Sequence, residues 1–215
     1  MKLRITKSAC LCLLGLSGSL IATLLDGDGM EDHLRCLREL FIMASAASLH
    51  EIGHVLAAWG GGNPLRSLRL DLFGARLTLG GLLSYRREWI IAAAGPFVNL
   101  LSATLVLPLC MRCMPSSPVG EGLRLFFTVS LGLAFINLLP VRSLDGGRLL
   151  RCTLAPLCGE RLADGMLTAT TALSLGALWL LSVYALLRVG EMLSLFVFSL
   201  CLLLRVLCPD QTGEI

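Results

Sequence analysis

Hydrophobic residues occur along this chain in long blocks separated by short polar connections. Six blocks are apolar enough and long enough to cross a lipid bilayer, which takes about 20 residues of helix. They are Ser8–Leu25, Cys36–Trp59, Glu88–Leu109, Leu123–Val141, Met166–Leu187 and Met192–Leu207. This pattern predicts an all-α polytopic membrane protein with about six transmembrane helices.

The segment between the second and third blocks, Gly60–Trp89, has a different pattern. It is rich in glycine, and its leucines alternate with charged or polar residues on both sides of Gly74. Period-two alternation interrupted by a glycine is typical of two short strands joined by a turn. We therefore expect a short β-hairpin or re-entrant segment at the membrane surface, within residues 64–86.

Basic residues are concentrated in alternate connections between the apolar blocks. The N-terminus, the 60–89 segment and the predicted loop 142–165 are basic, whereas 26–35 and 111–122 carry fewer positive charges. The positive-inside rule then places both termini in the cytoplasm. Ser8–Leu25 follows a basic start, as in a signal peptide, but it is long and lacks a clear A-x-A cleavage site. We expect it to be retained as the first span.

Composition agrees with a membrane protein and indicates neither nucleic-acid binding nor a cysteine-based metal or redox site. The 215 residues are 55% hydrophobic and only 15% charged, against about 25% charged in a typical soluble domain. The net charge of +3 indicates no particular partner, and no nucleic-acid-binding signature is present. Most of the nine cysteines lie in or beside apolar segments, where cysteine packs as a small hydrophobe. Cys110 and Cys113 form a single CxxC, which favours packing thiols over a metal or redox site.

The second apolar block contains the pentapeptide His50-Glu51-Ile52-Gly53-His54, with two of the three histidines of the chain. Residues four apart share a helix face, so both imidazoles can bind one ion while Glu51 acts on a water beside it. This is the HExxH pattern of zinc hydrolases. Ionisable groups inside a membrane span are costly unless liganded or paired. A Zn²⁺ site is therefore favoured over the alternative, a hydrogen-bonded structural cluster.

A catalytic zinc site needs a third protein ligand, and two familiar spacings fail here. The metzincin pattern would need a histidine at Gly60, and no glutamate occurs between His54 and Glu88. Asp145 is the better candidate. Pro140 breaks the helix before it, and the two glycines after it let the backbone turn sharply toward the imidazoles. An Asp-Gly-Gly sequence is also common in ordinary turns.

Two further blocks accompany the pentapeptide. They are Ala93-Ala94-Gly95-Pro96-Phe97-Val98-Asn99 and Asn137-x-x-Pro140-x-x-x-Leu144-Asp145-Gly146-Gly147. Together the three blocks resemble the signatures of the site-2 protease family of intramembrane zinc metalloproteases, over roughly residues 45–150. The compact layout is most similar to the branch that contains the stage IV sporulation protease FB. Members of that branch often carry a C-terminal CBS domain. Since the sequence ends at Ile215, the resemblance does not extend to nucleotide-sensing regulation through such a domain, nor does it fix the exact subfamily.

The resemblance implies a role for each matching polar residue. Three residues would bind zinc: His50, His54 and Asp145. Glu51 would activate water as the general base. Asn99 and Asn137 would bind the substrate backbone or stabilise the developing oxyanion, with interhelical hydrogen bonding as the alternative. Gly95 is expected to permit close helix packing.

These inferences predict an intramembrane zinc metalloendopeptidase that cleaves a membrane-embedded or membrane-tethered protein, such as a pro-sigma factor in sporulation. It would be a multi-pass protein of a bacterial inner or cell membrane, whose partners are the lipid bilayer, the substrate and regulatory membrane proteins. An exposed strand in 65–80 would pair with the extended substrate by β-addition. The alternatives are a membrane metal transporter, which would need acids and histidines on several spans, and a non-catalytic protease-like adaptor.

The same pattern predicts three parts in the chain. Residues 1–35 would form the first span and an external loop. Residues 36–150 would be the catalytic core, with spans two to four and the hairpin 64–86. Residues 151–215 would form a cytoplasmic loop and a C-terminal helical hairpin of spans five and six.

Overall fold

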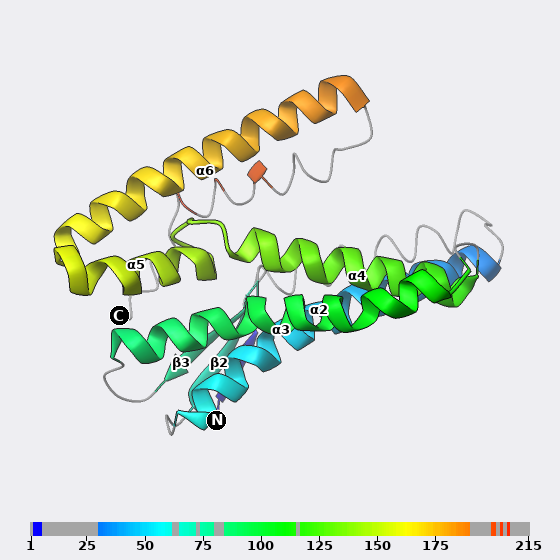
Figure 1. Ribbon diagram of the computed structural model, residues 1–215, viewed down its shortest axis with the longest axis horizontal. Coiled ribbons are helices and arrows are strands. Elements are labelled where there is room, and N and C mark those ends of the chain that lie inside the picture. The colour runs from blue at the N-terminus through cyan, green and yellow to red at the C-terminus, as the bar shows by residue number, and fades with distance from the viewer. Residues whose placement is uncertain are drawn as a thin grey trace. The chain divides into compact units, whose positions relative to one another are not determined.

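The computed structural model describes residues 2–5, 30–61, 65–71, 74–79, 84–114, 117–189, 199, 200, 203 and 206. Within these residues, five helices and three strands follow in the order β1, α2, β2, β3, α3, α4, α5, α6 (Figure 1). The chain forms two compact units, Met1–Phe135 and Ile136–Ile215. The three-part organisation by membrane topology stays a prediction.

Four helices are long and apolar enough to cross a membrane: α2 (Met30–Gly60), α3 (Tyr85–Arg112), α4 (Pro118–Asn137) and α6 (Glu160–Val189). They coincide with the second to fifth predicted spans. Many of their large apolar side chains are exposed, as lipid-facing side chains are. The first predicted span and most of the sixth lie outside the described residues, so the total of six spans stays a prediction.

The first unit contains a three-stranded sheet with strand order β1-β2-β3. β2 (Leu65–Asp71) and β3 (Gly74–Leu79) pair antiparallel inside the segment where the sequence predicts a hairpin, and β3 contacts α2. β1 (Lys2–Ile5) pairs parallel with β2. This strand was not predicted, because its partner is distant in the sequence and its residues resemble the basic start of a span. The position of the hairpin at the membrane surface stays a prediction.

The predicted loop 142–165 is wrong for most of its length. Asp145–Cys158 form α5, a short helix that packs against α6, and Gly159 separates the two helices at a φ of 87° that favours glycine. The 14 residues of α5 are too few to cross a bilayer. The segment was predicted as a loop because it is too short for a span and contains arginines and glycines. Its apolar residues lie on one face of the helix, which buries Cys152 and Ala155.

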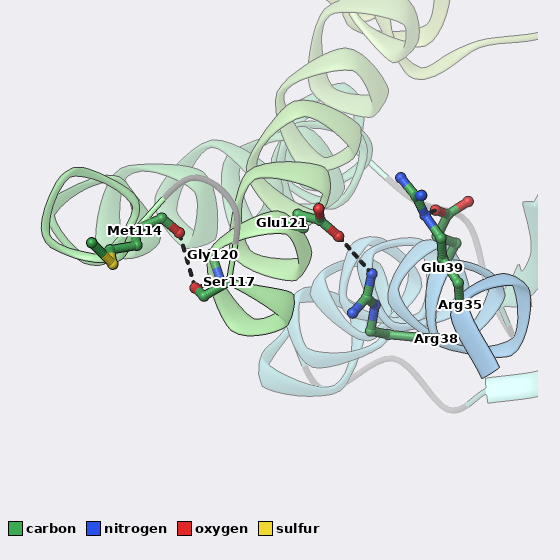
Figure 2. Close-up of polar contacts among 7 residues, drawn as sticks. All are labelled: Arg35, Arg38, Glu39, Met114, Ser117, Gly120 and Glu121. Atoms are coloured by element: carbon green, nitrogen blue, oxygen red, sulfur yellow. Dashed lines mark hydrogen bonds and ion pairs between the residues drawn. The ribbon is translucent and has the colours of Figure 1, made fainter. Parts of the chain in front are cut away.

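The start of α4 is fixed by a serine cap. The Ser117 hydroxyl accepts a hydrogen bond from the Gly120 N–H (3.0 Å) and donates one to the Met114 carbonyl oxygen (2.9 Å), as Figure 2 shows. Pro118 occupies the first helical position, where no N–H is needed. A side chain at Gly120 would collide with the same Met114 carbonyl. These contacts define the connection from α3 to α4.

An ion pair links α2 to the start of α4. Arg38 Nη2 lies 3.0 Å from Glu121 Oε2, and Arg35 pairs with Glu39 along α2 itself at 3.2 Å (Figure 2). Both pairs are partly exposed, so each would contribute at most about 1 kcal/mol in water. The Arg38–Glu121 pair mainly holds the two helices in one relative orientation within the first unit.

Candidate metal centre

α2 carries the two predicted histidine ligands on one face. His50 and His54 are one helical turn apart and are only 6% and 5% exposed. Their rings meet edge to face with centroids 4.8 Å apart, and their Nε2 atoms are separated by 3.2 Å. The structure therefore brings together the two imidazoles, as the i, i+4 spacing predicts.

The distance between the two Nε2 atoms fits one zinc ion. Zinc–imidazole bonds of about 2.0–2.1 Å at a tetrahedral angle place two ligand nitrogens about 3.3 Å apart. The observed separation is 3.2 Å. Imidazole nitrogens are also ligands that Zn²⁺ commonly takes in proteins. Both the donor type and the spacing thus suit the metal.

The backbone of α3 fixes the tautomer of His54. Its Nδ1 lies 2.7 Å from the Ile91 carbonyl oxygen in a buried contact. A carbonyl oxygen only accepts, so Nδ1 carries the proton and donates it. Nε2 of the same ring then keeps a lone pair. This is the tautomer that a metal ligand needs, and zinc-binding histidines commonly donate their other N–H in this way.

Two glycines allow α3 to approach the imidazoles. A Cβ at Gly95 of α3 would touch His54 Nε2, and it would lie 2.6 Å from His54 Cε1 and 2.9 Å from His50 Cε1. A Cβ at Gly53 of α2 would lie 2.7 Å from the Ala94 carbonyl oxygen. Only hydrogen fits at these two positions. The close helix packing predicted for Gly95 is confirmed.

Asn99 of α3 contacts the other nitrogen of His50. Its Nδ2 lies 3.3 Å from His50 Nδ1, and the residue is fully buried. Its Oδ1 is also buried and has no hydrogen-bond partner among the described residues. Ile91, Gly95 and Asn99 are each four residues apart, so they share the face of α3 that packs against the imidazoles.

Glu51 lies next to His50 on α2, in the same helical turn as both histidines. It is partly buried, whereas the following residue, Ile52, is exposed. Burying a carboxylate in the middle of an apolar helix costs free energy unless the carboxylate is paired with another polar group. Between residues 45 and 60, the ionisable groups of this helix are Glu51, His50 and His54. The carboxylate thus lies beside the two imidazoles.

The second unit contains the predicted acidic ligand. Asp145 is the first residue of α5 and is 8% exposed. A negative charge in the first turn is favoured by the helix dipole. Side chains at Gly146 and Gly147 would collide with the carbonyl oxygens of Leu138 and Val141, respectively. The two glycines therefore let the preceding loop fold tightly against the start of α5.

One threonine of α6 holds the loop that precedes Asp145. Thr171 is 4% exposed; its hydroxyl accepts a hydrogen bond from the Arg142 N–H at 3.0 Å and donates one to the Pro140 carbonyl at 3.5 Å. Apolar residues beside this contact form the core of the unit: Val141, Leu144 and Leu175. The position of Asp145 within the second unit thus depends on α6 as well as on its own helix.

The two asparagines that share one implied role have different surroundings. Asn99 is within hydrogen-bond distance of an imidazole in the first unit. Asn137 ends α4, belongs to the second unit and is partly buried. The contact of Asn99 with His50 is the interhelical hydrogen bond given as the alternative from the sequence, although its partner was not predicted, and the role of the Ile91 carbonyl was missed. The four-residue spacing of Ile91, Gly95 and Asn99 is the signal that would have indicated a common face.

Comparisons with known proteins point to one group of enzymes. The sequence model described as "Peptidase family M50" matches residues 113–181, which include Asp145. A predicted zinc metalloprotease of Synechocystis sp., sll0528, is 30% identical over 166 residues, which are 70% of this chain and 41% of that protein. A predicted zinc metalloprotease of Mycobacterium tuberculosis, Rip3, is 37% identical over 122 residues, 54% of this chain and 31% of that protein. The chain thus spans less than half the length of these relatives.

A solved structure shows the fold. The site-2 protease from Methanocaldococcus jannaschii matches with a TM-score of 0.64 at 18% identity, over 99% of this chain and 92% of that chain. The resemblance indicated by the three motifs is therefore confirmed, whereas the stage IV sporulation protease FB branch stays a prediction. This chain is thus similar in sequence to peptidase family M50 over residues 113–181 and to two zinc metalloproteases, and it has the fold of a site-2 protease.

Proposed function

We propose that this chain is an intramembrane zinc metalloendopeptidase, which hydrolyses a peptide bond in or beside a transmembrane segment of another membrane protein. The observation that carries the proposal is the buried His50–His54 pair, whose Nε2 atoms are 3.2 Å apart in a helix apolar enough to cross a membrane. Ionisable groups in such a helix are functional by default. The relatives and the fold support the same reaction class.

Three residues are proposed to hold the zinc ion: His50, His54 and Asp145. Three protein ligands are the number that a catalytic zinc site uses, since the fourth position stays open for water or substrate. Asp145 is supported by its burial at the start of α5 and by the Asp-Gly-Gly block in which it lies. A buried carboxylate is usually paired or bound to a metal.

The third ligand can be tested separately from the protease activity. We expect Asp145→Asn to reduce the zinc affinity of the purified protein by at least about tenfold, because a neutral amide is a poorer ligand than a carboxylate. Ser143→Ala, in the same loop, should keep the wild-type affinity. Elemental analysis after dialysis against a weak chelator measures both variants. Wild-type zinc content in Asp145→Asn would show that another acid is the third ligand.

The proposed reaction adds one water across the scissile amide. Zinc, when bound, supplies Lewis-acid polarisation of the carbonyl and acidifies a water molecule. Glu51 takes a proton from that water as it attacks the carbonyl carbon, and returns it to the leaving amine nitrogen as the C–N bond breaks. The Ile91 carbonyl holds the His54 ring in its required tautomer throughout.

The substrate is proposed to be membrane-embedded or membrane-tethered, because the two candidate histidine ligands, His50 and His54, lie inside a helix apolar enough to cross the bilayer. His50 precedes the end of α2 at Gly60 by roughly 15 Å of helix. A substrate helix must unwind there to expose its amide bond. β3 lies at one edge of the strand order β1-β2-β3 and could pair with the extended segment. Deleting 66–79 should then impair cleavage more than folding.

The biological role is proposed to be regulated proteolysis of a membrane-tethered transcription factor precursor, such as a pro-sigma factor. The resemblance of the compact layout to the sporulation branch supports this role. Cytoplasmic termini are proposed from the positive-inside rule, and regulatory membrane proteins are proposed as further partners.

Co-expression with candidate membrane-tethered substrates tests the proposed activity. The wild type should convert the true substrate to a shorter product, whereas Glu51→Gln at equal expression should leave it intact. Product of the same size and amount with Glu51→Gln would reject the protease mechanism.

A further inference from the structure

The hydrogen-bonding groups around the two imidazoles form a chain that runs from the Ile91 carbonyl through His54 and His50 to Asn99. Since His54 Nδ1 donates to Ile91, its Nε2 has a lone pair. His50 Nε2, 3.2 Å away, donates to that lone pair when it carries the ring proton. His50 Nδ1 then accepts from Asn99 Nδ2 at 3.3 Å. Asn99 Oδ1 is left without a partner among the described residues.

A metal ligand at His50 needs the opposite tautomer. Its Nε2 must offer a lone pair, so the neutral ring carries its proton on Nδ1. This N–H would face the NH₂ group of Asn99, and two donors would oppose each other at 3.3 Å. A half-turn of the amide exchanges its two ends and brings Oδ1 to face Nδ1. The oxygen that lacks a partner then accepts a hydrogen bond.

We propose that Asn99 is a positioning residue that holds His50 in its metal-binding tautomer. The amide supports the metal-free pair as a donor and, after a half-turn, the metal-bound pair as an acceptor. This role differs from the substrate contact that the family resemblance implies, and it follows from the full burial of Asn99 against His50. The proposal rests on the proposed zinc site.

Zinc affinity distinguishes an acceptor role from a merely structural one. The full chain in detergent is titrated with zinc against a competing chelator. Asn99→Leu should bind zinc about 10–100-fold more weakly, the usual effect of removing a group that orients a metal ligand. Asn99→Asp should stay within about threefold of the wild type, because a carboxylate accepts the Nδ1–H bond. Ser130→Ala is the matched control, since Ser130 of α4 is equally buried and its Oγ has no partner among the described residues.

Two results would overturn the role of Asn99. One is wild-type zinc affinity in Asn99→Leu. The other is an equal loss in Asn99→Leu and Asn99→Asp, which would indicate a purely structural asparagine. A wild-type protein that binds no zinc would overturn the proposed function as well, so the two failures are distinguishable.

A second measurement needs no variant at position 99. The chain has only three histidines, so ¹⁵N spectra of histidine-labelled wild type resolve few rings. His50 should carry its proton on Nε2 without zinc and on Nδ1 with zinc. An Nε2-protonated His50 in the zinc-loaded protein would overturn the proposal even if Asn99→Leu does not fold.

Discussion

At the scale of single residues, the candidate metal centre depends on a position that has no side chain. Gly95 contributes only hydrogen where a Cβ would lie 2.6 Å from His54 Cε1 and 2.9 Å from His50 Cε1. The α3 backbone can therefore pack against both rings. The Ile91 carbonyl reaches His54 Nδ1 only because the helices are this close.

Replacing Gly95 by alanine should displace the imidazoles without weakening the helix. Alanine favours a helix over glycine by about 1 kcal/mol, so α3 should form normally in Gly95→Ala. The added methyl group would occupy the space of the two rings. We expect zinc affinity to fall by at least about tenfold, as measured by competition with a chelator.

Gly132→Ala in α4 is the matched control for Gly95→Ala. No described atom outside the local helix backbone lies within 4 Å of the position of its Cβ. This variant should bind zinc as the wild type does and unfold at the same or a higher temperature. Equal zinc affinity in both glycine variants would show that α3 does not confine the imidazoles.

Contacts within one helix could be predicted from the sequence, whereas contacts between two helices could not. The His50–His54 pair was predictable because positions four apart meet on any helix. The Ile91 carbonyl and the Asn99 amide were not, because their contacts depend on the packing of α2 against α3. A backbone carbonyl also leaves no trace in residue type.

At the scale of elements, the loop between α4 and α5 is held by α6. Thr171 uses its single hydroxyl twice, accepting from the Arg142 N–H and donating to the Pro140 carbonyl. Both contacts are with the backbone of the segment that leads into Asp145. The hydroxyl thus provides hydrogen bonds to two backbone groups of the loop, where Pro140 has ended the helix and no helical partner is present.

Thr171→Val should destabilise the protein while keeping nearly the same shape at this position. The Arg142 N–H would lose its acceptor in this partly buried contact, which costs about 1 kcal/mol of unfolding free energy. The loss is measured by denaturant unfolding in detergent. Thr170→Val is the comparison, because among the described residues the Thr170 hydroxyl bonds only to the Leu167 carbonyl of its own helix. Equal stability of the two variants would contradict the role of Thr171.

The elements themselves were predictable to different degrees. Apolar length alone indicates α2, α3, α4 and α6, because nothing else supplies so many consecutive hydrophobic residues. α5 was predicted as a loop, since it is short and carries arginines, and only its packing against α6 shows which face is apolar. Period-two alternation indicates β2 and β3, but β1 depends on a long-range pairing that no local pattern reveals.

At the scale of the whole molecule, basic connections predict one orientation in the membrane. Alkaline phosphatase fused after Met114 should be active, because the connection between α3 and α4 is predicted to be external. Fusions after Gly61 or Gly159 should be inactive, because these connections are predicted to be cytoplasmic. The reverse pattern of activity would invert the orientation and place the candidate zinc ligands nearer the external face.

The central claim is that the HExxH helix holds a zinc site with Glu51 as its general base. Purified wild type and Glu51→Gln should each contain one zinc ion per chain, because Glu51 is not proposed as a ligand. Cleavage of an identified membrane-tethered substrate should be about 10²–10⁴-fold slower in Glu51→Gln, the usual effect of losing a general base. Comparing the zinc content and the cleavage rate of the two preparations is the most direct measurement. Full cleavage by Glu51→Gln, or a wild type that cleaves without bound zinc, would contradict the claim.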